Sequence, residues 1–269
     1  MPGQVIFQQH GPLARVTLSH PGKLGAMSRA MWRELKAVFE SVQAARDIRC
    51  VVLQGEGGAF CAGGDIAEYP EFRFDEASLR DFHEGDVWGG LGAVLACDVP
   101  IVAMIEGACM GAGVEIASCC DIRVAADNAR FGAPIAKLGF PMAPREVEVV
   151  AREAGLATLR EMLLQAAVFD AAEMKRRGFL HEVVPPAELA SRVAARAEAI
   201  AALAPQAARL NKRALRAVAA RFSEENRAAG RMDAAPAAMD SVAGAYAYAA
   251  SEEHREGIAA FLEKRKPAF

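Results

Sequence analysis

The chain lacks the features that would place it in a membrane, outside the cell or on nucleic acid. Its apolar stretch around Pro100–Ile105 is far too short to cross a bilayer and ends at Glu106. The start, Met1-Pro2-Gly3-Gln4, has no charged region followed by an apolar run and a small-residue cleavage site. With a net charge of −3, a basic nucleic-acid-binding surface is not expected. We therefore expect a soluble cytoplasmic protein that binds neither membranes nor nucleic acid.

The chain also lacks a cysteine pattern. Its six cysteines lie in apolar or small-residue stretches, without the spacing of a disulfide framework or a zinc site. Two of them, Cys119 and Cys120, are neighbours, which is a poor geometry for a structural disulfide. This usage favours a reducing compartment and predicts no metal ligands.

Three common glycine motifs are absent, although the chain has two glycine-rich turns. Neither turn has the Gly-x-Gly-x-x-Gly of dinucleotide-binding folds or a Gly-Lys-Ser/Thr, and the chain contains no Gly-x-Ser-x-Gly elbow. The turns, Gly55–Ile66 and Gly107–Gly113, each follow a predicted buried strand. The second precedes a helix, so its free N–H groups favour negative charge. A tight turn without further function would explain each one equally well.

Strands alternate with helices over most of the chain, which predicts an α/β fold. We expect strands at Val5–Gln9, Ala14–Ser19, Cys50–Gln54, Ile101–Ile105, Asp121–Ala125 and Arg130–Gly132, and helices after Ser28 and across Val87–Ala96 and from about Val114. Beyond about Pro185 the composition turns to Ala, Arg and Glu, with helices at Ala187–Leu203, Gln206–Ala219, within Asn226–Ala250 and across Ser251–Lys264. We therefore predict an α/β core over residues 1–195 and a helical part over 196–269.

Five motifs in order resemble the crotonase (enoyl-CoA hydratase/isomerase) superfamily, almost from end to end. They are His20–Ser28, Ala59–Ile66, Met110–Ala117 with Cys120–Arg123, Phe131–Pro134 with Leu138-Gly139, and Ser251–Pro267. The resemblance implies a spiral of repeated ββα units with a helical C-terminal region used for trimerisation. It further implies a homotrimer or a dimer of trimers that acts on an acyl-CoA, with no cofactor beyond the coenzyme A of the substrate.

The resemblance also implies where the site lies. The family's oxyanion hole maps onto the backbone N–H groups of Gly64 and Ala112, and its catalytic glutamate onto Glu115. Its coenzyme A contacts map onto Lys23, Leu24, Ala26, Ala62, Gly64, Asp65, Ile66 and Ala112, and onto Phe261 and Lys264, which reach across a subunit boundary in many members. Ala112 stands where glycine is common, so its φ must be negative for the turn to form.

Glu115 is three residues after Ala112, so one helical turn would bring its carboxyl group to the same pocket. On sequence alone it could equally be a first-turn glutamate that favours the helix dipole. The matching family position favours catalysis.

Ile135 is the main departure from the family pattern. The hydratases that this chain resembles carry a second glutamate there, and an isoleucine can neither hold water nor transfer its protons. Glu146 could replace the missing acid, but we expect it to be a solvated residue in the first turn of a helix. His83 has a side chain suited to proton transfer, but we expect a partly exposed structural histidine. We expect Asp121 to satisfy local backbone or capping groups and Cys61 to pack among small residues.

Three hypotheses remain. The first is an enoyl-CoA hydratase-like enzyme that works through an enolate, with Glu115 as acid and base. The second is a different crotonase-type reaction, such as double-bond isomerisation. The third is a non-catalytic acyl-CoA-binding or assembly protein, which Ile135 favours and Glu115 opposes. The polar segment from about Glu68 to Asp81 is expected to shape the acyl pocket.

Overall fold

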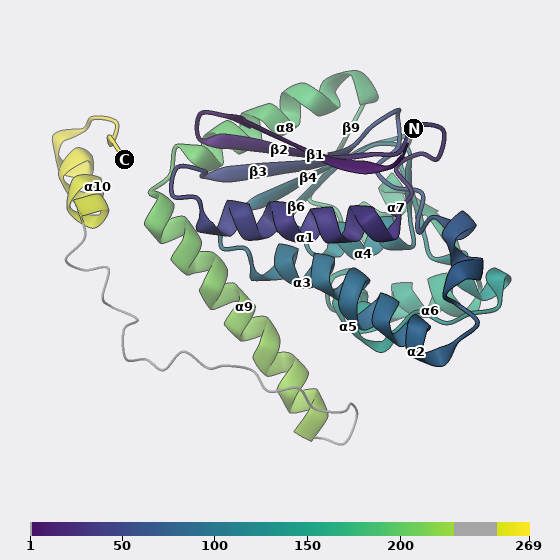
Figure 1. Ribbon diagram of the computed structural model, residues 1–269. Helices are drawn as coiled ribbons and strands as arrows, with labels where there is room; N and C mark the ends of the chain where they lie inside the picture. The colour runs from purple at the N-terminus through teal and green to yellow at the C-terminus, as the bar shows by residue number, and fades with distance from the viewer. Residues whose placement is uncertain (1, 229–251) are drawn as a thin grey trace.

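Six strands form the main sheet of the protein, whose computed structural model describes residues 2–228 and 252–269 (Figure 1). Their order is β1-β2-β3-β4-β6-β9, antiparallel between β1 and β2 and parallel from β2 onward. Their bounds are Gln4–His10, Leu13–Ser19, Cys50–Gly55, Ile101–Ile105, Ile122–Ala126 and Glu182–Val184. The strands predicted before residue 135 are thus confirmed within a residue or so at their ends.

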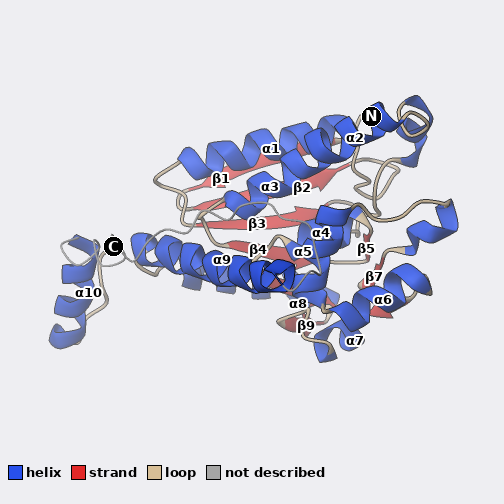
Figure 2. Cartoon of the chain, turned by 90° about the horizontal axis from the view of Figure 1, so that it is seen from below, coloured by secondary structure: helices blue, strands red, loops and turns tan. Residues whose placement is uncertain are grey.

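Strand β3 shows why this sheet has helices on both faces. Its apolar residues alternate, so Cys50 and Val52 pack toward one hydrophobic cluster while Val51 and Leu53 pack toward the other. Helix α8 (Pro186–Ala201) covers the first face, and α1 (Arg29–Ala44) and α3 (Trp88–Ala96) lie against the opposite one (Figures 1 and 2). A run that is apolar on both faces is typical of a parallel strand buried between helices.

Three short strands form a second sheet. It consists of β5 (Ala108–Met110), β7 (Arg130–Gly132) and β8 (Val168–Asp170) in the order β5-β7-β8. The pairs β1-β2, β4-β5 and β6-β7 are each followed by a helix. This repetition confirms the ββα spiral that the resemblance implied.

The remaining helices are mostly short. They are the 3-10 helices η1 (Ile66–Glu71) and η3 (Pro134–Leu138), the single π-helical turn η2 (Phe82–Val87), and α2 (Glu76–Asp81), α4 (Ala112–Ser118), α5 (Pro144–Ala154), α6 (Leu156–Leu164), α7 (Ala171–Arg176), α9 (Pro205–Ala228) and α10 (Glu252–Glu263). The predicted Ser28 N-cap is present, since its hydroxyl accepts a hydrogen bond from the Met31 N–H at 3.2 Å. None of the described helices has the length and apolarity to span a bilayer.

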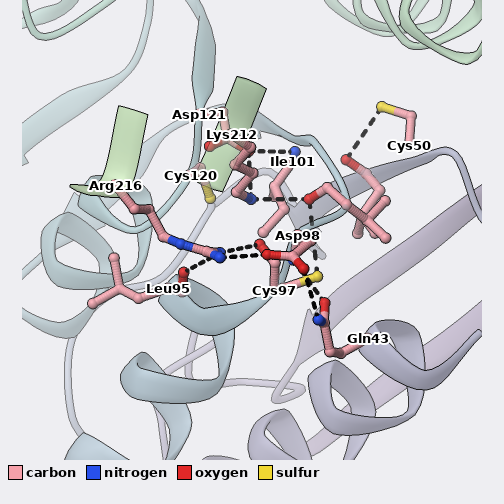
Figure 3. A network of polar contacts seen from close by, with 12 residues as sticks. Gln43, Cys50, Leu95, Cys97, Asp98, Ile101, Cys120, Asp121, Lys212 and Arg216 are labelled. Carbon is pink, nitrogen blue, oxygen red and sulfur yellow. Dashed lines mark hydrogen bonds and ion pairs between the residues drawn. The ribbon is translucent and has the colours of Figure 1, made fainter. Parts of the chain in front are cut away.

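Helix α9 is fastened to the core by charged groups (Figure 3). Lys212 donates to the Val99 carbonyl at 2.9 Å and pairs with Asp121 at 2.7 Å. Arg216 donates to the Cys97 carbonyl at 2.9 Å and pairs with the buried Asp98. Asp121 also accepts from the Ile101 N–H, which confirms its expected capping role. The core-facing side of α9 is therefore cationic.

The boundary predicted at residue 195 falls inside α8, a helix that packs on the main six-stranded sheet. The division into two domains stays a prediction. The expected helix within Asn226–Ala250 lies outside the described residues from 229 onward.

Candidate active site

The two glycine-rich turns lie against each other at the ends of β3 and β5. The Cys61 N–H donates to the Ala108 carbonyl and the Met110 N–H donates to the Cys61 carbonyl, both at 2.9 Å. A Cβ atom at Gly113 would lie 2.5 Å from the Cys61 carbonyl oxygen. Only glycine allows this approach. Gly113 therefore lets the start of α4 lie directly against the first turn.

Each bend offers a free main-chain donor. Within the described residues, the N–H groups of Gly64 and Ala112 donate no hydrogen bond, whereas their neighbours Asp65 and Gly111 donate to Met27 and Gly132. Ala112 begins α4, and it is Gly111 that takes the positive φ, at 48°. The negative φ that Ala112 requires is therefore present, and alanine fits where glycine was expected.

Both donors line one pocket with a volume of about 350 Å³. Its walls come from the two turns, from η1 and η2, from η3 and from the start of α5. The lining is mainly apolar, with carboxyl, imidazole and guanidinium groups from Glu115, Glu146, His83 and Arg73. A concave apolar site with a few convergent polar groups is typical of ligand binding.

Glu115 extends from the first turn of α4 into this pocket, as its position after Ala112 predicted. Burial and, second to it, the charge of Glu146 raise the pKa of its carboxyl group to about 8, while Arg73 opposes the shift. Near neutral pH this carboxyl group therefore holds its proton. A protonated carboxylic acid in an apolar pocket is suited to proton donation.

Glu146 is not the solvated residue that we expected. It is 2% exposed and lines the pocket from α5. The reason is its place on the helix, because Val149 and Val150 are three and four residues later and are buried on the same face. That spacing is the signal in the sequence that could have identified it.

Ile135 also lines the pocket, from η3, so the carboxylate missing at this position is missing inside the site. His83 lies in η2 and is partly exposed, as expected, with 19% of its side chain accessible. Its Nδ1 is 3.2 Å from Oε1 of Glu146. The sequence placed these two residues 63 positions apart and gave no signal of their contact.

The polar segment after Ile66 does shape the pocket, as expected, through two residues that sequence reasoning did not single out. Tyr69 and Arg73 line it, and the Arg73 guanidinium lies 4.3 Å from the Tyr69 ring centre and 3.7 Å from that of Phe140. These contacts hold a positive charge over aromatic rings beside Glu115.

The residues expected to bind coenzyme A form one neighbourhood at the first turn. Lys23 pairs with the buried Asp65 at 2.6 Å, and Asp65 also caps η1 by accepting from the Ala67 N–H. The Leu24 carbonyl accepts from the Ala62 N–H at 3.0 Å. Leu24 and Ile66 are both about half exposed, which leaves apolar surface beside the pocket.

The remaining predicted contacts differ in position. Ala62 and Ile66 line the pocket. Ala26 is buried, and its carbonyl lies 2.6 Å from Nδ1 of His20. Lys264 is exposed at the end of α10 and is not among the lining residues, and the side chain of Phe261 lies outside the described residues. Cys61 is fully buried, and burial raises the pKa of its thiol to about 12, which fits packing rather than nucleophilic attack.

A fold of repeated ββα units, with two glycine-rich turns and a buried glutamate in one pocket, has the features expected of a crotonase-type α/β protein. The description of the matching family model is enoyl-CoA hydratase/isomerase, and the match covers residues 8–269. The chain belongs to this family of enzymes.

Relatives and solved structures agree with this assignment. A probable enoyl-CoA hydratase of Mycobacterium bovis is 32% identical over 98% of this chain and 97% of its own length. A short-chain-enoyl-CoA hydratase of Clostridium acetobutylicum is 30% identical over 97% and 95%. The crystal structure of an enoyl-CoA hydratase/carnitine racemase from Magnetospirillum magneticum has a TM-score of 0.88, with 35% identity, over 98% of this chain and 94% of that one.

Proposed function

We propose that this protein is an enoyl-CoA hydratase that adds water to an enoyl thioester through an enolate. The observation that carries this proposal is the pair of unused amide donors at Gly64 and Ala112 in one pocket with Glu115. No cofactor is needed, because the thioester itself makes the adjacent carbon acidic.

The two amides act on the thioester oxygen. When a nucleophile adds to the β-carbon, negative charge moves to that oxygen, and fixed N–H donors stabilise it. The loss of one such donor typically costs about 3 kcal/mol. Since both donors belong to the main chain, a side-chain substitution affects them only through the geometry of the turns.

Glu115 then delivers a proton to the α-carbon. Its raised pKa supports this role, because the acid must still hold its proton near neutral pH. The coenzyme A moiety would lie along Leu24, Ala62 and Ile66, with Lys23 beside it for a phosphate group.

Isomerisation of the double bond is the second candidate, since it is a different reaction on the same enolate intermediate and adds no water. The non-catalytic alternative has less support, because a buried carboxyl group with a strongly raised pKa in a pocket is typical of a functional site.

Subunit assembly forms part of the same proposal. Lys264 and Phe261 would reach the coenzyme A of a neighbouring subunit, in a homotrimer or a dimer of trimers.

The test is the loss of enone absorbance with short and medium enoyl-CoAs, with wild type compared to Glu115→Gln. We expect kcat to fall by about 10²- to 10⁴-fold, because acid–base catalysis contributes that much. Binding of the saturated acyl-CoA should persist. Mass spectrometry separates the outcomes: a product heavier by one water supports hydration, and an unchanged mass with a moved double bond supports isomerisation. Binding without turnover of any thioester would overturn the proposal.

A further inference from the structure

We propose that Glu146 is the second proton-transfer group of this site, in place of the carboxylate that Ile135 lacks, and that His83 positions it. This inference rests on the proposed hydratase function and identifies the group that activates the water.

The first support is a buried carboxylate oxygen with no partner. Oε1 of Glu146 faces Nδ1 of His83, whereas Oε2 is buried with no hydrogen-bond partner among the described residues. An unpaired carboxylate oxygen in the protein interior is destabilising, because it has lost its hydrogen bonds to water without replacement. Such a group in a pocket wall, rather than in the core, is poised for a ligand such as water.

The second support is the way the carboxylate is held. Glu146 is the third residue of α5, where the helix dipole favours negative charge. His83 approaches from η2, and π-helical turns are frequent at functional sites. Outside this contact, Glu84 and Arg145 form an exposed ion pair at 3.3 Å between the same two elements. Exposed ion pairs contribute little to stability, so the contact between His83 and Glu146 is the one that orients the carboxylate.

The third support is the electrostatic relation between the two glutamates. The charge of Glu146 is the second cause, after burial, of the raised pKa of Glu115. Arg73 is the cation that opposes this shift, and Tyr69, His83 and Lys137 are the other titratable groups that line the pocket. The pocket therefore has an acid and a base at once, as hydration requires.

The step balances with these two groups alone. Water gives a proton to Oε2 of Glu146 as its oxygen forms a bond to C3 of the enoyl thioester. The C2=C3 electron pair moves through C2 to the thioester oxygen, which is held by the two amides. When the carbonyl re-forms, C2 takes the proton of Glu115. Glu146 ends protonated and Glu115 ionised, and proton exchange through solvent restores the starting state.

The main test compares Glu146→Gln with wild type and with Glu84→Gln, a matched control at the same η2–α5 junction outside the pocket. We expect Glu146→Gln to lower kcat for hydration by about 10²-fold or more with little change in KM, and Glu84→Gln to stay near wild type. The melting temperature of Glu146→Gln should stay equal or rise, because a buried carboxylate whose Oε2 has no partner is replaced by a neutral amide. A glutamate with a structural role would instead lower it.

Rescue gives a second, independent readout. In the Glu146→Gln background, Ile135→Glu should raise the rate at least tenfold, because it returns a carboxylate to the lining of the same pocket. In wild type the same change should bring no comparable gain, since a base is already present. If Glu146→Gln does not fold, Glu146→Met replaces it in this experiment. If neither variant folds, Glu146 has a structural role and the proposal is overturned.

The role of His83 is tested with two variants. Asparagine can place its amide nitrogen near the position of Nδ1, so His83→Asn should keep most of kcat. His83→Phe should lose roughly tenfold in kcat at unchanged KM, because the carboxylate remains but its orientation is lost.

The pH profile distinguishes catalysis from simple packing. Removal of the Glu146 charge should move the alkaline limb that reports Glu115 to lower pH. Wild-type hydration with an unaffected Glu146→Gln rate would overturn this inference and leave the hydratase proposal intact. Absence of hydration in wild type would instead overturn the proposed function.

Discussion

At the scale of single residues, Glu115 makes stability depend on pH. Its pKa is about 8 in the folded protein and near 4.5 when solvated. Between these values the folded state binds more protons than the unfolded state, so the free energy of unfolding falls as pH rises through this window. Glu115→Gln removes this contribution. We expect urea unfolding to show wild type losing more stability than Glu115→Gln between about pH 5 and pH 8; equal losses would contradict the burial of this carboxyl group.

Glu115 and Glu146 show what the sequence could predict about the site. Glu115 follows Ala112 in one short motif, so helix spacing was enough to bring it to the second turn, whereas the meeting of the two turns was implied by the family resemblance. Glu146 approaches His83 only through the packing of α5 on η2, and its one local signal is the apolar spacing to Val149 and Val150. Arg73 and Tyr69 lie in a polar segment whose fold depends on contacts with Phe140. Nothing local encodes these contacts.

At the scale of elements, the spacing of the two turns depends on Gly113. A methyl group there would meet the Cys61 carbonyl at 2.5 Å, so Gly113→Ala must push α4 away from the first turn. We expect kcat to fall by about tenfold or more, because both donors then miss the same oxygen. Kinetics with the preferred enoyl-CoA measure this, and Ala112→Gly, which adds no atoms, is the control. A wild-type rate in folded Gly113→Ala would contradict the contact.

The elements differ in how far the sequence predicts them. Strands β1 to β7 (β5 apart) and helix α1 follow from apolar alternation and a Ser28 cap. Helices α6 and α7 and strands β8 and β9 were not assigned, because their segments are short, and α5 was missed although its buried residues follow helical spacing. Strand order is also beyond local patterns, since β4 pairs with β6 while β5 leaves for the second sheet.

At the scale of the whole molecule, α9 has the opposite of the usual distribution of side chains, because charged groups face the core and apolar groups face outward. Its core-facing side carries the cations Lys212 and Arg216, while Leu215 and Val218, three residues apart, are 70% and 49% exposed. Apolar side chains that face away from the core fit burial against another subunit. This pattern supports the proposed trimer.

The mass in solution tests this assembly. By light scattering, wild type should have three or six times the mass of one chain, and Leu215→Asp should shift the protein toward monomer because a charge then replaces apolar contact. Leu164→Asp, at an equally exposed leucine on α6 with 81% exposure, should leave the mass unchanged. A monomeric wild type would refute the assembly and, with it, the roles of Phe261 and Lys264.

The two free amides have a further consequence for how the protein responds to its medium. Peptide N–H groups do not ionise in the range where proteins stay folded, so the anchor for the thioester oxygen is equally strong at every working pH. An uncharged thioester that lacks the coenzyme A phosphates should therefore bind to these amides with a flat pH profile, and any slope would report the titratable side chains of the pocket.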